Sequence, residues 1–225
     1  MERIVHPVSN RPNEQEIAAY RRLLDGMSPS CVVADSMERE GVLRSDIRPL
    51  VAARIAGPAL TVHLVTGDLV DCLDALEVAQ ADDVIVVDAG GETETAVWGG
   101  LMSRLSQMKG VAGAIIDGAA RDVDEIRQLG FPVFSRALVP RSTHSPFSKR
   151  TIPIEVNVPV HCGGILVFPG DIIIGDEVGV VAVPFAVRAS VLERAQAQMA
   201  QEEMTRQRIS EGRSVEELLA EFGRL

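Results

Sequence analysis

The chain contains two short apolar runs bounded by polar residues, at 84–87 (VIVV) and 111–116 (VAGAII). Both have the length of a strand, and continuous apolar runs are typical of strands that a parallel sheet buries on both faces. A stretch with helical spacing follows each run. This alternation predicts an α/β fold in which neighbouring strands are parallel.

The most regular helical pattern lies between these two runs. Leu101, Leu105 and Met108 recur at i, i+4 and i+7, which predicts that they form the buried face of a helix. Lys109-Gly110 suits the end of that helix, with a cation in the last turn and a glycine where φ is positive. The second strand is expected to stop at Asp117-Gly118.

The remaining elements follow from the same rules. Helices are predicted at 14–24, 71–81, 185–209 and 215–222 and from 123 onward, with a short helix or turn at 28–33 and strands at 54–65 and 131–134. Gly57-Pro58 interrupts the strand at 54–65 and predicts an edge or a bulge. Residues 152–184 predict short antiparallel or mixed strands. Their Gly-Asp pairs, at 170–171 and 175–176, suit tight turns better than a metal-binding loop.

Two of the predicted strand-to-helix turns, Gly99-Gly100 and Arg121-Asp122, are candidates for a ligand site. Parallel strands end at one edge of an open α/β sheet, and ligands bind in the crevice there. Helix N-termini offer an anion free N–H groups and partial positive charge. Arg121 adds a forked donor for carboxylates, and Asp122 adds a hard oxygen ligand for Mg²⁺ or Mn²⁺. The pattern predicts a site for a small anionic oxo acid held on a divalent cation.

The same residues also fit purely structural roles. Asp122 and Glu125 have the spacing of a capping box, which needs no ligand. Arg121 suits a solvated surface, and the two glycines suit a plain loop. Asp88 and Asp117, at predicted strand ends, suit turns, helix caps or hydrogen bonds to the residues that hold the metal. Spacing alone leaves both interpretations open.

Composition narrows the classes of function. A formal net charge of −10 argues against nucleic acid or an anionic membrane as a partner, because phosphate binding needs clustered Lys and Arg. No apolar run approaches the ~20 residues of a membrane span, and no signal-peptide core is found near Met1. The three cysteines are scattered without a CxxC pair, which predicts a cytoplasmic protein without a zinc site.

Lysine is scarce, since only Lys109 and Lys149 occur. Schiff-base aldol chemistry needs a desolvated lysine, whereas Lys109 suits a helix end and Lys149 a polar loop. Carbon–carbon cleavage beside a carbonyl is therefore expected to need a metal as the electron sink. His63 and His161 lie in strand-like runs and are expected in the core or at an edge, whereas His144, in a loop, is a candidate functional residue.

Two long segments are similar to the RraA-like family. They are residues 110–141, GVAGAIIDGAARDVDEIRQLGFPVFSRALVPR, and residues 158–184, VPVHCGGILVFPGDIIIGDEVGVVAVP. The family includes class II pyruvate aldolases that cleave 4-hydroxy-4-methyl-2-oxoglutarate and 4-carboxy-4-hydroxy-2-oxoadipate. It also includes RraA, a protein inhibitor of ribonuclease E. The resemblance implies a layered β/β/α fold of the swivelling-domain type that assembles as a trimer or a dimer of trimers.

The resemblance also implies three parts of the chain. They are an N-terminal arm and helix at 1–27, an RraA-like α/β domain at 28–184 and a C-terminal helical extension at 185–225. The extension is expected to lie across a neighbouring subunit. Glu202 or Glu203 is then the acid that approaches that subunit's site.

The family's catalytic signature is an acid, twenty further residues, Arg-Asp, and another acid three residues after the Asp. Arg121, Asp122 and Glu125 match it, and Gly100 stands in the place of the first acid. The resemblance implies that Asp122 holds the metal and that Arg121 pairs with the developing oxyanion. The substrate carboxylate is expected to bind the backbone N–H groups of Gly99, Gly100, Leu101 and Met102.

The expected reaction is metal-dependent cleavage beside a 2-oxo acid that releases pyruvate, by retro-aldol cleavage, oxaloacetate decarboxylation or both. Because Gly100 lacks a carboxylate to relay a proton, we expect weak cleavage of 4-hydroxy-4-methyl-2-oxoglutarate and measurable decarboxylation, and Gly100→Asp is expected to raise the aldolase rate. Two alternatives are a non-catalytic protein with an acidic binding surface and an enzyme of the same fold for a different oxo acid. Specificity is expected in the loops at 89–97 and 141–150.

Overall fold

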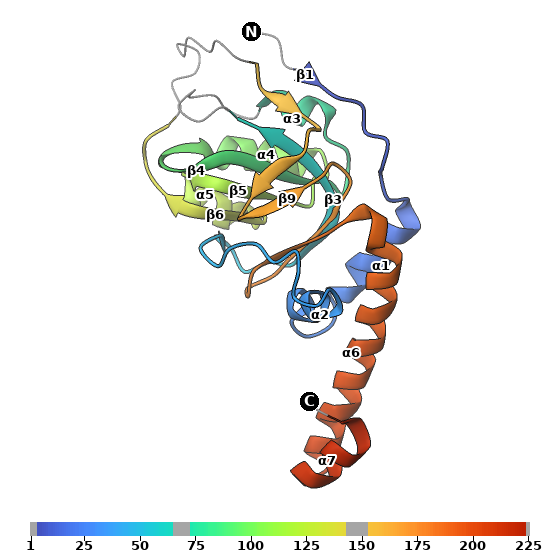
Figure 1. Cartoon of the computed structure of the whole chain (residues 1–225). Coiled ribbons are helices and arrows are strands. Elements are labelled where there is room, and N and C mark those ends of the chain that lie inside the picture. Colours follow the sequence, from blue (N-terminus) through green and yellow to red (C-terminus); the bar gives the residue numbers. More distant parts are fainter. Residues whose placement is uncertain (1–3, 65–72, 143–152, 224–225) are drawn as a thin grey trace.

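The computed structural model describes residues 4–64, 73–142 and 153–223. Its centre is four parallel strands that lie side by side in chain order (Figure 1): β3 (Ile55–His63), β4 (Val84–Trp98), β5 (Gly113–Ala120) and β6 (Val133–Leu138). The predicted α/β fold with parallel neighbouring strands is therefore confirmed.

Shorter strands extend this sheet on both sides. Beyond β6 lies antiparallel β2 (Arg48–Pro49), and beyond β3 lie β7 (Glu155–Val156) and β1 (Ile4–Val5). β10 (Ile172–Gly175) pairs antiparallel with the start of β3 and with β11 (Val180–Val183). β8 (Val160–Cys162) and β9 (Ile165–Val167) form a separate hairpin. The short antiparallel and mixed strands predicted here are confirmed between residues 153 and 184.

Apolar residues fill both faces of the central sheet. On one face, Val87, Ile116 and neighbouring side chains pack against α3 (Leu73–Val78), α4 (Gly100–Met108) and α5 (Val123–Leu129). On the other face, Val86, Ile115 and their neighbours pack against the β8–β9 hairpin and β10. This is the expected β/β/α layering, and strand alternation explains why adjacent residues serve opposite layers.

A third apolar cluster joins both ends of the chain to the sheet. α1 (Glu14–Leu23), α2 (Pro29–Ser36) and the start of α6 (Arg188–Ser210) pack side chains such as Tyr20 and Val191 on β10 and β11. A 3₁₀ turn, η1 (Phe185–Val187), leads into α6, so the predicted long helix begins three residues later than expected. No helix in the described ranges has the length and apolar composition needed to cross a membrane.

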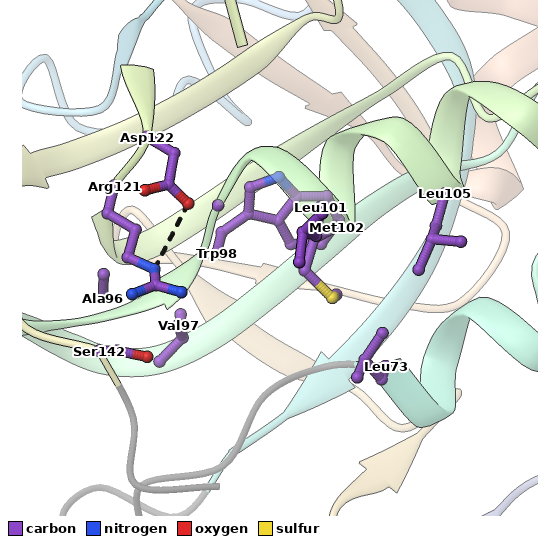
Figure 2. Close-up of a pocket in the computed structure, with 11 residues that line it drawn as sticks. Leu73, Ala96, Val97, Trp98, Leu101, Met102, Leu105, Arg121, Asp122 and Ser142 are labelled. Atoms are coloured by element: carbon purple, nitrogen blue, oxygen red, sulfur yellow. Dashed lines mark ion pairs between the residues drawn. The ribbon is translucent and has the colours of Figure 1, made fainter. Parts of the chain in front are cut away.

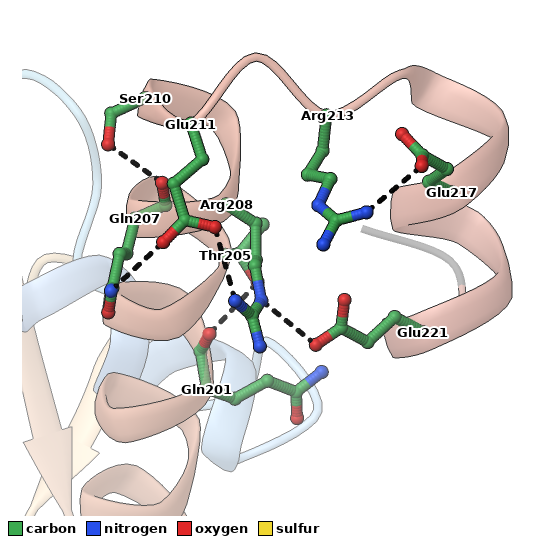
Figure 3. A network of polar contacts seen from close by, with 9 residues as sticks. All are labelled: Gln201, Thr205, Gln207, Arg208, Ser210, Glu211, Arg213, Glu217 and Glu221. Atoms are coloured by element: carbon green, nitrogen blue, oxygen red, sulfur yellow. Dashed lines mark hydrogen bonds and ion pairs between the residues drawn. The ribbon is translucent and has the colours of Figure 1, made fainter.

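The second half of α6 projects away from the body, and α7 (Val215–Phe222) folds back beside it (Figure 1). Polar contacts join the two helices (Figure 3). Arg208 pairs with Glu211, at the C-terminal end of α6, and with Glu221 on α7, each at 3.1 Å. A capping box between Ser214 and Glu217 starts α7. The predicted second short helix is therefore confirmed.

Two predicted strand ends were wrong. β5 continues through Asp117-Gly118 to Ala120, and β4 continues to Trp98 through the segment predicted as a loop at 89–97. The pairing of β4 with β5 is irregular, with register shifts between Asp88 and Trp98. Gly90 and Gly91 have positive φ in this stretch. Extra residues of β4 thus bulge out before pairing resumes, and a local Asp-Gly turn signal does not report such long-range pairing.

At Gly57-Pro58, where the sequence predicted an edge or a bulge, the strand has a paired neighbour on one side only among the described strands. β3 lies inside the sheet, and these residues mark the point where it changes partners. Ile55 to Pro58 pair with β10, and the parallel pairing with β4 begins at Ala59. Proline, which has no N–H to donate, is tolerated at this junction.

Candidate active site

The ends of β4 and β5 bring the two predicted turns side by side. Trp98 at the end of β4 pairs with Ala120 at the end of β5. The Arg121 N–H donates to the Trp98 carbonyl at 3.0 Å, and the Gly100 N–H donates to Asp122 Oδ2 at 3.2 Å. The prediction that the glycine turn and the Arg-Asp turn share one edge of the sheet is confirmed.

Gly99 permits this close approach. A Cβ at this position would lie 2.7 Å from Asp122 Oδ2 and 3.3 Å from Arg121 Cγ. The backbone of Gly99 is extended, so any residue could adopt its conformation. The requirement for glycine here is therefore one of space beside the Arg-Asp pair.

Asp122 has an unusual backbone conformation. Its φ of 54° and ψ of 42° lie in the left-handed region, which costs a residue with a side chain about 1–2 kcal/mol. Its carboxylate makes no capping bond with α5, so the interpretation of Asp122 and Glu125 as a capping box was wrong. Instead the carboxylate is 41% exposed and lies 3.5 Å from Arg121 Nε. Strain of this kind at a cavity is a mark of functional sites.

Glu125 occupies the space that a side chain at position 100 would need. A Cβ on Gly100 would lie 2.6 Å from Glu125 Cδ and would overlap the carboxylate itself. Arg104, one turn along α4, donates from Nε and Nη2 to Glu125 Oε1 at 3.2 and 3.0 Å. The Glu125 carboxylate, which matches the last acid of the family's signature, thus fills the space beside Gly100, where the signature has a further acid. The sequence pattern did not reveal the role of Arg104, because this contact crosses between two helices.

A cavity of about 250 Å³ opens beside the Arg121-Asp122 pair (Figure 2). Its lining comes from the ends of β4 and β5, from α4 and from the start of α3. The lining residues are Leu73, Ala96, Val97, Trp98, Gly99, Leu101, Met102, Leu105, Arg121, Asp122 and Ser142. The cavity therefore includes Leu101 and Met102 of the predicted carboxylate-binding turn. Their N–H groups lie in the first turn of α4, where no intrahelical acceptor is available.

The prediction that Leu101, Leu105 and Met108 form the buried face of α4 was wrong. These side chains are 70%, 42% and 78% exposed. The face of α4 toward the sheet carries Met102 and two buried serines, Ser103 and Ser106. Small side chains let the helix approach the sheet closely. The serine hydroxyls are satisfied, since Ser103 Oγ accepts from the Trp98 indole at 2.9 Å and both serines donate to carbonyls one turn earlier.

The other predicted acids have partners elsewhere. Asp117 is buried and binds the Arg136 guanidinium, while its Oδ2 accepts the Gly163 N–H at 2.8 Å. Asp88 accepts the His161 N–H at 3.2 Å and lies 3.4 Å from His63 Nδ1. These carboxylates anchor the β8–β9 hairpin, which has no ladder to the main sheet. Among the contacts found in the described ranges, none joins Asp117 to the Arg121-Asp122 pair.

His63 sits on an inner strand, half exposed, and His161 is exposed on β8. Burial raises the pKa of the neighbouring Cys162 thiol well above its ordinary value, and the nearby Asp117 carboxylate raises it further. A thiol in this environment is protonated and unreactive. This polar cluster is therefore a structural joint between the hairpin and the sheet.

Several other predicted residues are away from the cavity or outside the described ranges. Lys109 donates to the carbonyls of Leu76 and Glu77 at the end of α3, as a helix-end cation does. Glu202 and Glu203 pair with Arg206 on α6, which packs against α1 and α2. His144 and Lys149 lie outside the described residues, as does most of the loop at 141–150.

The donors beside the cavity suit a hard divalent cation. The Asp122 carboxylate lines the cavity, and the Glu125 carboxylate lies beside the same glycine, Gly100. Mg²⁺ keeps several waters and is commonly held through one or two carboxylates, so these two acids fit it. No cluster of three or more His, Cys, Asp or Glu side chains that suits a metal occurs within residues 4–64, 73–142 and 153–223. Among the described residues, the donor set therefore consists of these two carboxylates and does not form a closed protein cage.

The chain resembles named aldolases in sequence. A Halalkalibacterium halodurans protein, named provisionally as a 4-hydroxy-4-methyl-2-oxoglutarate aldolase, is 35% identical over 184 residues, which cover 81% of this chain and 85% of that protein. The 4-hydroxy-4-methyl-2-oxoglutarate aldolase of Thermus thermophilus is 33% identical over 132 residues, covering 59% of this chain and 77% of that protein.

Solved structures show the same fold. An uncharacterized protein from Pseudomonas syringae pv. tomato matches with a TM-score of 0.81 and 26% identity, over 96% of this chain and 99% of that chain. Streptomyces coelicolor RraAS2, described as an unusual member of the RNase ES inhibitor RraA protein family, matches with a TM-score of 0.74 and 28% identity, over 88% of this chain and 100% of its own. Residues 30–182 match the RraA-like family profile, described as Aldolase/RraA. The chain therefore belongs to the RraA-like (Aldolase/RraA) family.

Proposed function

We propose that the cavity beside Arg121 and Asp122 is the active site of a divalent-metal-dependent lyase that releases pyruvate from a 2-oxo acid. The observation that carries this proposal is the convergence of three kinds of group on one cavity. They are the carboxylate of a residue with a left-handed backbone, a guanidinium and the N-terminus of α4. The names of the aldolase relatives support the same class of reaction.

Asp122 would hold the ion, directly or through water. A bound divalent ion supplies a Lewis acid that favours formation of the pyruvate enolate. The first N–H groups of α4, at Leu101 and Met102, bind the substrate carboxylate in this proposal, aided by the positive end of the helix. Arg121 donates to the oxygen on which negative charge develops.

Glu125 is the proposed general base for retro-aldol cleavage. The C3–C4 bond breaks, its electron pair passes to C3, and the proton of the C4 hydroxyl passes to Glu125. The C4 fragment leaves as a carbonyl compound, and protonation of C3 gives pyruvate. Arg104 orients the carboxylate through its two hydrogen bonds. Oxaloacetate decarboxylation has no hydroxyl proton to remove, so it needs the metal and Arg121 but not this base.

The proposal is tested by pyruvate release from oxaloacetate with Mg²⁺ or Mn²⁺, with and without EDTA. Asp122→Asn is the sharpest variant, because asparagine keeps the shape and tolerates the left-handed backbone but loses the charge. We expect this variant to lose metal-dependent turnover, while its free energy of unfolding stays within about 1 kcal/mol of the wild-type value. Asp124→Asn, an exposed neighbour in the same turn, is the matched control. Full turnover in Asp122→Asn would assign Asp122 a structural role only.

The same assay separates the enzyme from the regulator named among its structural relatives. A non-catalytic regulator would release no pyruvate and bind no Mn²⁺ at Asp122. Assembly as a trimer or dimer of trimers, with Glu202 or Glu203 near a neighbour's site, stays a prediction. Light scattering of the full chain tests the assembly.

A further inference from the structure

One peptide group links the buried side of α4 to the carboxylate of Asp122. It joins Gly99 to Gly100, so its oxygen is the Gly99 carbonyl oxygen and its hydrogen is that of the Gly100 N–H. This N–H donates to Asp122 Oδ2 at 3.2 Å. Because a peptide group is planar, a contact that fixes its oxygen also fixes the direction of its N–H. The contacts of the Gly99 carbonyl therefore bear on the position of the Asp122 carboxylate.

Ser103 holds the Gly99 carbonyl twice. Its backbone N–H donates to the carbonyl oxygen at 3.1 Å, as the first hydrogen bond of α4, and its hydroxyl donates to the same oxygen at 3.0 Å. The indole N–H of Trp98 in turn donates to Ser103 Oγ at 2.9 Å. Both side chains are buried. These contacts form a chain from the Trp98 indole, through the Ser103 hydroxyl, to the peptide group that binds Asp122.

The chemistry of the indole fixes the direction of this chain. An indole nitrogen donates one hydrogen bond and accepts none, so Ser103 Oγ is the acceptor of the Trp98 bond. The hydroxyl proton is then directed to the Gly99 carbonyl. Hydrogen bonds in a buried chain polarise one another, so a carbonyl that accepts two of them makes the N–H of its own peptide group a stronger donor. The chain therefore presents an oriented and strengthened N–H to Asp122.

Trp98 also holds the other member of the ion pair. Its carbonyl accepts the Arg121 N–H at 3.0 Å, and Arg121 Nε lies 3.5 Å from Asp122 Oδ2. All three residues line the same cavity (Figure 2). The Asp122 side chain is 41% exposed, and an exposed carboxylate without a fixed partner samples several rotamers. Trp98 thus limits the freedom of Arg121 through its backbone and of Asp122 through Ser103.

We infer that Ser103 is a positioning residue of the metal site that the proposed lyase function requires. Its hydroxyl, directed by the Trp98 indole, holds the peptide group between Gly99 and Gly100, and the Gly100 N–H then fixes the orientation of the Asp122 carboxylate. Ser103 is not among the residues that line the cavity, so it acts only through these neighbours. Removal of a group that orients a metal-binding side chain typically weakens metal binding about 10- to 100-fold.

Ser106 is a matched control on the same face of α4. It lies one turn after Ser103, is equally buried, and donates from its hydroxyl to the Met102 carbonyl at 2.8 Å. Among the contacts of the described residues, its hydroxyl reaches neither Trp98 nor the peptide group between Gly99 and Gly100. Replacement of either serine by alanine therefore removes the same buried atom, but only one replacement breaks the chain to Asp122.

The binding of Mn²⁺ measures this role without turnover. The free ion is followed by electron paramagnetic resonance as it is titrated with the full chain. We expect Ser103→Ala to bind Mn²⁺ about 10- to 100-fold more weakly than the wild type, and Ser106→Ala to stay within about twofold of it. Ser103→Cys fills the space and offers only a weak donor and acceptor, so it should weaken binding in the same direction. Circular dichroism verifies that the variants fold.

The fluorescence of Trp98 reports on the same chain, because this is the only tryptophan in the sequence. Loss of the hydrogen bond to Oγ should shift its emission to shorter wavelengths in Ser103→Ala, whereas Ser106→Ala should leave the emission unchanged. Wild-type affinity for Mn²⁺ in both Ser103→Ala and Ser103→Cys would overturn the inference. Equal losses of affinity in Ser103→Ala and Ser106→Ala would overturn it as well, since they would reflect packing alone.

Failure of the inference is distinguishable from failure of the proposed function. Asp122→Asn in the same titration tests the metal site itself. Binding of Mn²⁺ that requires Asp122 but not Ser103 would remove the positioning role and leave the proposed lyase standing. No binding of Mn²⁺ by the wild type would overturn both.

Discussion

Replacement of Glu125 by glutamine tests whether an acid on α5 performs the role that the family's signature gives to an acid on α4. Glutamine keeps the size of the side chain and one hydrogen bond to Arg104, but it cannot take a proton from the substrate hydroxyl. A positioned general base contributes about 10²–10⁴-fold, so retro-aldol turnover should fall by that factor. Oxaloacetate decarboxylation, which needs no base, should fall less than about tenfold.

The stability of the fold should hardly change. The Arg104–Glu125 pair is partly solvated, with side chains 54% and 30% exposed, and exposed ion pairs contribute about 0–1 kcal/mol. Loss of turnover in Glu125→Gln would therefore report chemistry and not unfolding. Both reactions are followed by pyruvate release, coupled to lactate dehydrogenase, with the same metal.

Because a side chain at position 100 and the Glu125 carboxylate compete for the same space, substitutions at position 100 provide a second test of the role of Glu125. An aspartate at position 100 is accommodated only if the Glu125 carboxylate moves aside, so Gly100→Asp alone should displace one acid as it adds another and should not raise the aldolase rate. This revises the expectation from the sequence that Gly100→Asp raises the aldolase rate. Gly100→Asp combined with Glu125→Ala should recover aldolase activity that Glu125→Ala has lost.

Two outcomes would refute this reasoning. Retro-aldol turnover in Glu125→Gln within a few-fold of the wild type would mean that another group takes the proton. Equal losses in both reactions would mean that Glu125 acts through the metal or through the position of Asp122.

Three further predictions follow from the contacts. Gly99→Ala should lower turnover by about 10²-fold by displacing the Asp122 carboxylate, whereas Gly179→Ala, with no neighbour within 4 Å, should be neutral; equal effects in the pyruvate assay would contradict the packing argument. Arg121→Lys should cost about 2–4 kcal/mol in transition-state stabilisation, measured as kcat/KM, and a change of only a few-fold would make Arg121 a surface charge. The Ser214 N–H at the start of α7 donates to Glu217 and lowers the pKa of its carboxyl group. The cap therefore stabilises α7 fully at pH values above the ordinary carboxyl pKa of 4.5, and this stabilisation is lost as the pH falls through the lower pKa of the folded state. An NMR titration of Glu217 measures that pKa, and an unshifted value would refute the prediction.

The sequence by itself determined where the two helices beside the site begin, although not where the preceding strands end. The turns Gly99-Gly100 and Arg121-Asp122, each preceded by an apolar run earlier in the chain, are local signals. The parallel arrangement of the strands then follows from the alternation of strand and helix. The alternation of strands and helices, together with the rule that parallel strands end at one edge of a sheet, was enough to predict that the two turns lie at the same edge.

Only the tertiary structure decided which face of α4 is buried. Periodicity identifies an apolar stripe on a helix, but the face that meets the sheet depends on how the helix is oriented when it packs against the strands. Here Ser103 and Ser106 face inward with satisfied hydroxyls, and Leu101 and Leu105 face the cavity. Burial is a property of what lies opposite a residue, which no local window contains.

The acid beside Gly100 was decided in the same way. Glu125 matches the family's signature in sequence, yet its place in the gap left by Gly100 depends on the packing of α5 against α4 and on the contact with Arg104. The continuation of β4 past Asp88 and of β5 past Asp117-Gly118 likewise depends on pairing between strands. Local signals fix what each segment prefers by itself, whereas contacts between distant segments fix which groups share a site, because those contacts form only when the chain has folded.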